Sequence, residues 1–199
     1  EQVKGLFSDF IIDSSRIGNS VEMRNKCISK VLTKVRDMQL SKTFTDNSID
    51  TVGDTYEYLM QMYASKAGKS GGEYFTPQEL SELLARIACC NIPNIQKVYD
   101  PACGSCSLLM KFVKYVGEKA SEIEFYGQEI NQLTSAIGRM NLFLHGVKDF
   151  NIVNDDTLIS PAFVEANKLK TFDLVLANPP YSISQWDREA FASDKYGRN

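Results

Sequence analysis

The chain has 199 residues, enough for one domain with a substantial core or for a domain with a small additional region. Its 22 Lys and Arg residues nearly balance its 25 Asp and Glu residues, and a net charge of -3 is not the electrostatic footprint of a stand-alone nucleic-acid binder. Because the sequence shows neither an apolar run long enough to span a membrane nor a signal peptide, we expect a cytoplasmic protein without a membrane segment.

Five cysteines and one histidine limit the metal and redox chemistry that the chain can support. An odd number of cysteines without a secretory signal is typical of reduced thiols. Cys103 and Cys106 form a C-x-x-C pair, but a zinc site needs more ligands and His145 is the single histidine, so we expect no metal site. A thioredoxin-like redox pair remains open as an alternative.

The first seventy residues are predicted to be helical. Apolar residues recur at helical spacing in two segments, one beginning near Val21 and one covering residues 53–67. The small, glycine-rich stretch 65–72 is predicted to be a linker. We therefore expect a helical N-terminal region, residues 1–70, followed by a second domain, residues 71–199.

A further helix is predicted to begin just after this linker. Thr76 can cap the helix, Pro77 suits its first turn, and Glu79 completes a Thr-x-x-Glu capping box. The N–H groups at the start of such a helix can hold a carboxylate, although the box can equally serve only to start the helix. Apolar residues follow on one predicted face: Leu80, Leu83, Leu84, Ile87 and Ala88.

From residue 97 onward, strand-like runs alternate with amphipathic helices. This alternation predicts βαβ units and a parallel sheet, that is, an α/β fold. Since the chain stops soon after the fourth strand, we expect that a C-terminal part of this sheet lies outside the sequence. The expected strands are 98–99, 123–127, 150–153 and 172–177, and the expected helices are 108–116 and 133–144.

The strongest functional signal follows the last of these strands. In Asn178-Pro179-Pro180-Tyr181 an amide and an aromatic ring are held on a stiff turn, because neither proline can continue the sheet pairing. Ligands of open α/β sheets bind at the carboxyl ends of the strands. A hydrogen-bonding amide beside a stacking ring suits a planar substrate that carries an amino group. An ordinary proline-rich strand exit is the structural alternative.

The ends of the first two predicted strands indicate a nucleoside cofactor. The first strand runs into the loop Asp100-Pro101-Ala102-Cys103-Gly104-Ser105, and Glu129 at the end of the second can hold both ribose hydroxyls. The loop lacks the G-x-G-x-x-G pattern that cradles a pyrophosphate, and Asp100 would repel phosphate but suits an ammonium. Ribose plus ammonium, without phosphate, describes S-adenosylmethionine.

Four motifs together resemble the DNA methyltransferases that act on the amino group of adenine. They are the Gly72–Pro77 element, the Asp100–Ser105 loop, Gln128-Glu129-Ile130-Asn131 and Asn178-Pro179-Pro180-Tyr181, in the order of the gamma class. The helical start, including Gly18-Asn19-Ser20-Val21, is similar to the modification (methylase) subunit of type I restriction-modification systems. The resemblance implies a Rossmann-like S-adenosylmethionine-dependent methyltransferase sheet, incomplete at its C-terminus, after an α-helical N-terminal region.

The resemblance also implies roles for individual residues. Glu129 would hold the cofactor ribose, and Asp156 would lie near the cofactor adenine. Asn178 and the Pro179 carbonyl would accept hydrogen bonds from the amino group of the target adenine, and Tyr181 would stack on that base after it is flipped from the duplex. Pro180 completes the catalytic motif, and the other implied cofactor residues are Glu73, Tyr74, Phe75, Thr76, Pro77, Gln78, Asp100, Ala102, Gly104, Ser105, Cys106 and Ser107.

By the same resemblance, the protein would methylate N6 of adenine in DNA. Two acceptors outside the ring plane would favour a pyramidal nitrogen, so the reaction would need no metal and no covalent intermediate. The implied partners are DNA, reached through the assembled complex, a specificity subunit, a restriction subunit and a second modification subunit. Two alternatives stay open: methylation of a protein glutamine amide or of RNA, and a non-catalytic DNA-embracing or assembly role.

One residue departs from the family pattern. Cys106 stands where the family loop usually has glycine, and glycine tolerates positive φ whereas cysteine does not. Either the loop avoids that conformation here, or cofactor binding is weakened.

Overall fold

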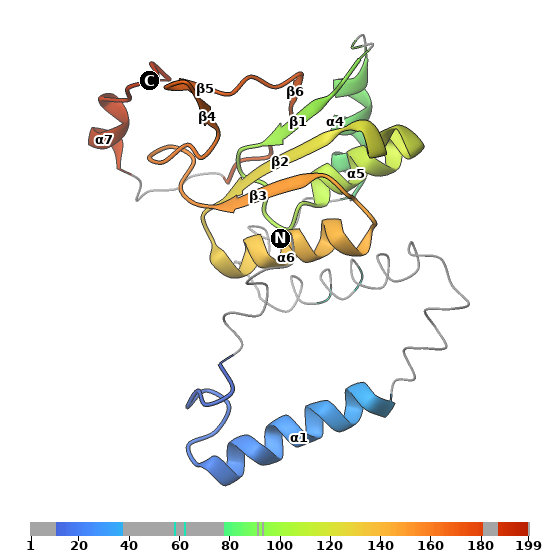
Figure 1. Ribbon diagram of the computed structural model, residues 1–199, viewed down its shortest axis with the longest axis vertical. Helices are drawn as coiled ribbons and strands as arrows, with labels where there is room; N and C mark the ends of the chain where they lie inside the picture. The colour runs from blue at the N-terminus through green and yellow to red at the C-terminus, as the bar shows by residue number, and fades with distance from the viewer. Residues whose placement is uncertain are drawn as a thin grey trace.

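The computed structural model describes residues 11–37, 58, 62, 78–90, 92, 94–180 and 187–198. Strands alternate with helices from β1 to β3, and a short hairpin and a fourth parallel strand follow (Figure 1). The helices are α1 (Val21–Asp37), α4 (Gln78–Cys89), α5 (Ser107–Val116), the 3-10 helix η2 (Gly117–Glu122), α6 (Gln132–Leu144) and α7 (Arg188–Ala192). The strands are β1 (Lys97–Asp100), β2 (Glu124–Glu129), β3 (Phe150–Asn154), β4 (Val164–Glu165), β5 (Lys168–Leu169) and β6 (Leu174–Val175).

The main sheet is parallel throughout, with the strand order β3-β2-β1-β6. Val98 of β1 lies between Phe125 of β2 and Leu174 of β6. Although β6 has only two residues, the Leu176 N–H also donates to the Tyr99 carbonyl at 2.9 Å, which extends its pairing with β1. The order therefore reverses between β1 and β6, and such a switch point is where open α/β sheets bind ligands. The predicted α/β fold is confirmed.

The two faces of the sheet are covered differently. On one face, Val98 and Phe125 pack with apolar residues of α5 and α6, and the rings of Phe112 and Phe125 meet edge to face at 6.2 Å. On the other face, Tyr99 and Tyr126 join Phe163 and Phe172 in an aromatic cluster with ring centroids 4.6–6.1 Å apart. The division follows from the alternation of side chains along each strand.

The sequence patterns did not predict the β4–β5 hairpin. Its two turn residues, Ala166 and Asn167, have φ of 48° and 63°, which is the left-handed pair that a two-residue hairpin turn requires. The signal was weak because alanine is an unusual residue at such a position. The hairpin is held to the sheet by Lys170, whose ammonium donates to the Tyr126 hydroxyl at 2.8 Å and pairs with Glu165 at 3.1 Å.

The buried faces of two helices differ from what apolar spacing alone suggests. In α6 the apolar residue Leu133 is 52% exposed, whereas the buried residues are mostly small or polar. In α4 the predicted face is confirmed in part: Leu84 and Ala88 pack against the core, whereas Leu80, Leu83 and Ile87 are exposed and Ser81 and Ala85 are buried. For α6 the reason is its neighbour: it packs against the loop after β1, where backbone leaves little room for large side chains. The buried residues of α6 are Thr134, Ser135, Gly138, Asn141 and Leu142.

Helix α1 confirms the helix predicted near Val21, but none of its residues is buried. Figure 1 shows it, in blue, away from the sheet. The linker, the Thr76 capping box and, apart from residues 58 and 62, the second predicted helix lie outside the described residues, so the boundary between regions 1–70 and 71–199 stays a prediction. Within the described ranges, no helix is both long and apolar enough to cross a membrane.

Candidate functional site

The loop after β1 is stabilised by hydrogen bonds between residues close together in the sequence. The Ala102 N–H donates to Asp100 Oδ1 at 3.0 Å, and the Cys106 N–H closes a turn onto the Cys103 carbonyl at 2.7 Å. Within this turn, Gly104 has φ +53°, and a Cβ added there would meet no atom within 4 Å. The backbone of Gly104 thus faces open space that a ligand could approach closely.

Glu129 joins this loop to the end of β2. Its Oε2 accepts a hydrogen bond from the Gly104 N–H at 3.0 Å, and its Oε1 accepts one from the Asn131 N–H at 2.8 Å. A carboxylate can accept about four hydrogen bonds, so capacity remains for further donors such as hydroxyls. The structure therefore brings together the two strand ends from which a nucleoside cofactor was predicted.

Among the charged cofactor residues that the structure describes, Asp100 is the most deeply buried, with 2% of its surface exposed. Burial raises the pKa of its carboxyl group to about 7, the Ala102 N–H partly opposes the rise, and the negative charge of Glu129 adds to it. Near neutral pH the carboxyl group is consequently poised between its two forms. A cation placed beside it, such as an ammonium, would favour the ionised form.

Cys106 does adopt the conformation that glycine would favour. It has φ 60° and ψ 20°, it precedes the first residue of α5, and its side chain is fully buried. Of the two alternatives, avoidance of positive φ by this loop is therefore wrong. The thiol fits because α6 has glycine opposite it: a Cβ on Gly138 would lie 2.7 Å from Cys106 Sγ and 2.9 Å from the Gly104 carbonyl oxygen. A left-handed non-glycine residue costs of order 1–3 kcal/mol, and burial of the thiol offsets part of that cost.

The C-x-x-C pair has the features of structural thiols. Cys103 and Cys106 are both buried, and a hydrogen bond with Cys106, together with burial, raises the pKa of Cys103 well above its ordinary value. A protonated, buried thiol is a poor nucleophile, which argues against the thioredoxin-like alternative. In the part of the chain that the structure describes, no group of three or more His, Cys, Asp or Glu side chains could hold a metal ion.

Three polar residues that sequence reasoning missed support this edge of the sheet. Asn141 of α6 donates to the Ser105 carbonyl at 3.0 Å. Gln128 is fully buried; its Nε2 donates to the Ser160 carbonyl at 2.7 Å and its Oε1 accepts from the Ala162 N–H at 3.1 Å. Thr157 donates through Oγ1 to the Pro101 carbonyl at 2.5 Å. The one available signal was Gln128, a polar residue at the end of the second predicted strand, since Thr157 lies in a loop and no periodic pattern marks Asn141 as buried.

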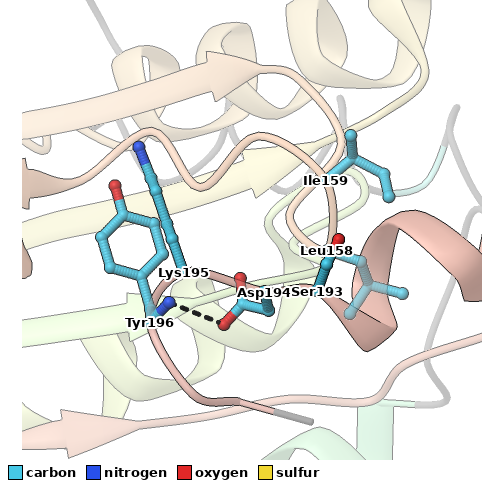
Figure 2. Close-up of a pocket in the computed structure, with 6 residues that line it drawn as sticks. All are labelled: Leu158, Ile159, Ser193, Asp194, Lys195 and Tyr196. Atoms are coloured by element: carbon cyan, nitrogen blue, oxygen red, sulfur yellow. Dashed lines mark hydrogen bonds between the residues drawn. The ribbon is translucent and has the colours of Figure 1, made fainter.

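Asp156 shapes the loop that follows β3. Its Oδ1 accepts hydrogen bonds from the N–H groups of Leu158 at 2.8 Å and Ile159 at 3.2 Å. A cavity of about 200 Å³ adjoins this loop, and Figure 2 shows Leu158 and Ile159 coming to it from one segment and Tyr196 from another. Its lining was not predicted, and it consists of Leu158, Ile159, Ser193, Asp194, Lys195 and Tyr196.

Asn178 follows β6 at the same edge of the sheet as the loop after β1. It is half-buried, and Pro179 and Pro180 after it are exposed. Gln78 opens α4, but its side chain, like Glu73, Tyr74, Phe75, Thr76, Pro77 and Tyr181, lies outside what the structure describes.

Known proteins share both the sequence and the fold of this chain. A family model described as N-6 DNA Methylase matches residues 47–199. The type I restriction enzyme MpnII methylase subunit of Mycoplasma pneumoniae is 47% identical over 191 residues, which cover 92% of this chain and 35% of the relative. The MjaVIII methylase subunit of Methanocaldococcus jannaschii is 32% identical over 160 residues, which cover 77% of this chain and 27% of the relative. The chain thus spans about a third of the length of these relatives.

Two solved structures extend the likeness to three dimensions. The methyltransferase subunit of a type I restriction-modification system from Streptococcus thermophilus is 30% identical, has a TM-score of 0.75, and is matched over 92% of this chain and 38% of its own. A Listeria monocytogenes structure assigned to the class I S-adenosylmethionine-dependent methyltransferases is 16% identical, with a TM-score of 0.56 over 89% of this chain and 49% of its own, and shares the fold. The chain, with its parallel Rossmann-like sheet and its match over residues 47–199, belongs to the N-6 DNA methylase family.

Proposed function

We propose that the protein transfers a methyl group from S-adenosylmethionine to the N6 amino group of adenine in DNA, as the modification subunit of a type I restriction-modification complex. The observation that carries the proposal is the position of the predicted cofactor loop relative to the predicted substrate motif. The loop that begins at Asp100 follows β1, Asn178 follows β6, and the strand order reverses between these two strands. A cofactor bound on one side would meet a substrate bound on the other at the point where such sheets place their ligands.

The residues on the β1 and β2 side fit S-adenosylmethionine. Glu129 is fixed by two backbone N–H groups and can accept from ribose hydroxyls, and the open backbone at Gly104 allows close approach. The buried carboxyl group of Asp100 suits the ammonium of the methionine part, and Ala102, Ser105, Cys106 and Ser107 complete the loop around that part. When bound, S-adenosylmethionine supplies an electrophilic methyl group on its sulfonium centre.

The residues on the β6 side would act on the substrate nitrogen. The Asn178 side-chain oxygen and the Pro179 carbonyl accept hydrogen bonds from the adenine amino group. This keeps the nitrogen lone pair out of the ring system, so that the lone pair can attack the methyl carbon. As the N–C bond forms, the bond from the methyl carbon to sulfur would break, S-adenosylhomocysteine would leave, and the methylated amino group would release one proton to solvent. Tyr181 stacks on the flipped base, and exposure of the two prolines leaves this side open to a substrate of that size.

Recognition of DNA sequence is assigned to a partner. A net charge of -3 supplies little general attraction for phosphates, and specific binding would come with a specificity subunit. The restriction subunit and a second modification subunit are the other proposed components. Solved structures of related type I subunits include one concerned with complex assembly and conformational transition in such a system, 28% identical with a TM-score of 0.54.

The test is a competition between substrate classes. The full-length chain, assembled with the specificity subunit of its own system, is given methyl-labelled S-adenosylmethionine with duplex DNA, RNA and total protein. We expect label in DNA alone, loss of most of that label in Asn178→Ala at short reaction times, and unchanged labelling in Asn151→Ala, an exposed asparagine of β3. Label in RNA or in protein would assign the same site to the alternative substrates.

A further inference from the structure

Residues 187–198, the described part of the chain beyond the Asn178–Pro180 motif, contact the loop that begins at Asp156. In this segment, the Arg198 guanidinium donates from Nη1 to the Thr157 carbonyl and from Nη2 to the Leu158 carbonyl, both at 2.6 Å. The contact joins residues that are 41 and 40 positions apart in the sequence. Hydrogen bonds from a charged donor are about twice as strong as neutral ones, so this is a firm attachment.

Asp194 holds the guanidinium in place. Its Oδ1 lies 2.6 Å from Arg198 Nη2, and its Oδ2 accepts from Nε at 3.2 Å and from the backbone N–H groups of Arg198 at 2.9 Å and Tyr196 at 3.1 Å. These bonds, led by the side-chain bond to Arg198, lower the pKa of Asp194 to about 2. Only 20% of the Arg198 side chain and 6% of the Asp194 side chain are exposed.

The α4 helix offers an instructive contrast. Arg86 and Glu82 form a pair with the same spacing of four residues and a similar distance, 2.7 Å, but their side chains are 62% and 53% exposed. An exposed pair of that kind contributes little, whereas a shielded pair that also binds backbone carbonyls fixes two segments of chain. Arg86 therefore serves as a matched control for Arg198.

The Asp156 loop has its polar groups fixed from both sides. Asp156 accepts hydrogen bonds from the N–H groups of Leu158 and Ile159. Arg198 donates to the carbonyls of Thr157 and Leu158. The Thr157 hydroxyl donates to the Pro101 carbonyl. Arg198 is thereby connected through Thr157 to the loop after β1. In the described residues this is a continuous hydrogen-bonded path from the segment beyond Asn178 to the predicted cofactor loop.

We propose that Arg198 is a positioning residue that, with Asp194, fastens the segment beyond the Asn178 motif to the Asp156 loop and so fixes the cofactor side of the site. The inference rests on the proposed function, in which the Asp156 loop receives the adenine end of S-adenosylmethionine. Arg198 touches the loop carbonyls and acts on the cofactor only through that loop. Its loss would therefore raise the cofactor KM more than it lowers kcat, since the reacting groups themselves are unchanged.

The experiment uses the full-length chain in its assembled complex, with S-adenosylhomocysteine as the binding probe. Calorimetry on the parent, Arg198→Ala, Arg198→Lys, Asp194→Asn and Arg86→Ala is combined with methyl-transfer kinetics at varied S-adenosylmethionine. We expect about tenfold weaker binding in Arg198→Ala and partial rescue in Arg198→Lys, because an ammonium can still reach one carbonyl. Arg86→Ala should match the parent.

Several outcomes would overturn the inference. One is an Arg198→Ala variant whose affinity for S-adenosylhomocysteine and KM for S-adenosylmethionine equal those of the parent. If that variant does not assemble, the same result in Asp194→Asn, in which the side chain keeps its size but loses its charge, would overturn the inference. A loss of kcat with unchanged cofactor affinity would also contradict it. Arg198-dependent cofactor binding with label in RNA or protein would sustain the inference and refute the proposed function, and a parent that binds no S-adenosylhomocysteine would refute both.

Discussion

The loop after β1 and the chain after β6 leave neighbouring strands at one edge of the sheet, yet they are built differently. The first is largely buried and hydrogen-bonded to its surroundings. Cys106 is fully buried, the Ser105 carbonyl accepts a hydrogen bond from Asn141, and the Gly104 N–H donates one to Glu129. The second places a half-buried Asn178 before two exposed prolines. Under the proposed function, the difference means that the cofactor side is preorganised by the fold, whereas the target side is open to a large substrate.

Preorganisation and openness fit the proposed chemistry. A small cofactor gains affinity when its binding groups are already fixed, because less order has to be created on binding. A base flipped from DNA needs an accessible entrance. If this comparison is right, substitutions on the two sides should change different quantities: affinity for the cofactor on one side, and the rate of transfer on the other.

The largest effect is expected at Asn178. In the assembled full-length enzyme, Asn178→Ala should lower the rate of methyl transfer by about 10²–10³-fold, by analogy with removal of one oxyanion-hole donor. Cofactor affinity should stay close to that of the parent, because Asn178 lies on the target side. Single-turnover kinetics with saturating cofactor and DNA measure the rate, and calorimetry measures the affinity. A large loss of cofactor affinity would show that Asn178 does not act on the target side alone.

The opposite pattern is expected at Glu129. Glu129→Ala removes the acceptor assigned to two ribose hydroxyls and also frees the Gly104 N–H, so S-adenosylmethionine affinity should weaken by about 1–3 kcal/mol. Glu129→Gln keeps one oxygen acceptor and should lose less. Calorimetry on both variants checks this, and unchanged affinity in the alanine variant would remove the ribose assignment.

Asp100 predicts a pH dependence of stability in the unliganded protein. Its folded-state pKa of about 7 lies above the ordinary value of 3.8, so the folded protein retains a proton that the unfolded chain loses. The contribution of this group to the free energy of unfolding is fully present below about pH 4. It decreases as the pH rises toward 7, by about 2 kcal/mol between pH 5 and 7. Among the residues that the structure describes, the ionisable groups that interact with Asp100 are Glu129, Cys103 and Tyr99.

Urea unfolding at several pH values measures this dependence, with Asp100→Asn as the comparison. The variant cannot titrate at this position, so its curve should be flatter over the same range. A parent whose stability rises from pH 5 to pH 7 by as much as that of Asp100→Asn would contradict the raised pKa.

The smallest effect is expected at Cys106. Cys106→Gly relieves a left-handed residue but removes a buried thiol that packs on Gly138, so stability should change by less than about 1 kcal/mol. Cofactor affinity should be kept or improved, since the loop retains its conformation. Clearly weaker binding in this variant would show that the thiol, and not only the backbone, shapes the loop.

Sequence reasoning succeeded where a short motif or a period determines structure locally. Parallel strands and the helices between them follow from alternating apolar runs, and the strand-end residues Asp100 and Glu129 were placed together. It failed where packing partners decide: α6 buries Gly138 and Asn141 because the loop backbone lies against it, and no periodic pattern encodes that neighbour. Arg198 was missed for a related reason, since its partners lie about 40 residues away.

The identity of the methylated atom, proposed to be the exocyclic nitrogen of adenine, can be determined from the reaction product. DNA is treated with the full-length assembled enzyme and labelled S-adenosylmethionine, then digested to nucleosides and analysed by mass spectrometry. We expect labelled N6-methyl-2′-deoxyadenosine, formed about 10²–10³-fold more slowly when Asn178→Ala replaces the parent. Label on the exocyclic nitrogen or on a ring carbon of cytosine, or label on adenine that Asn178→Ala forms at the rate of the parent, would contradict the proposed function.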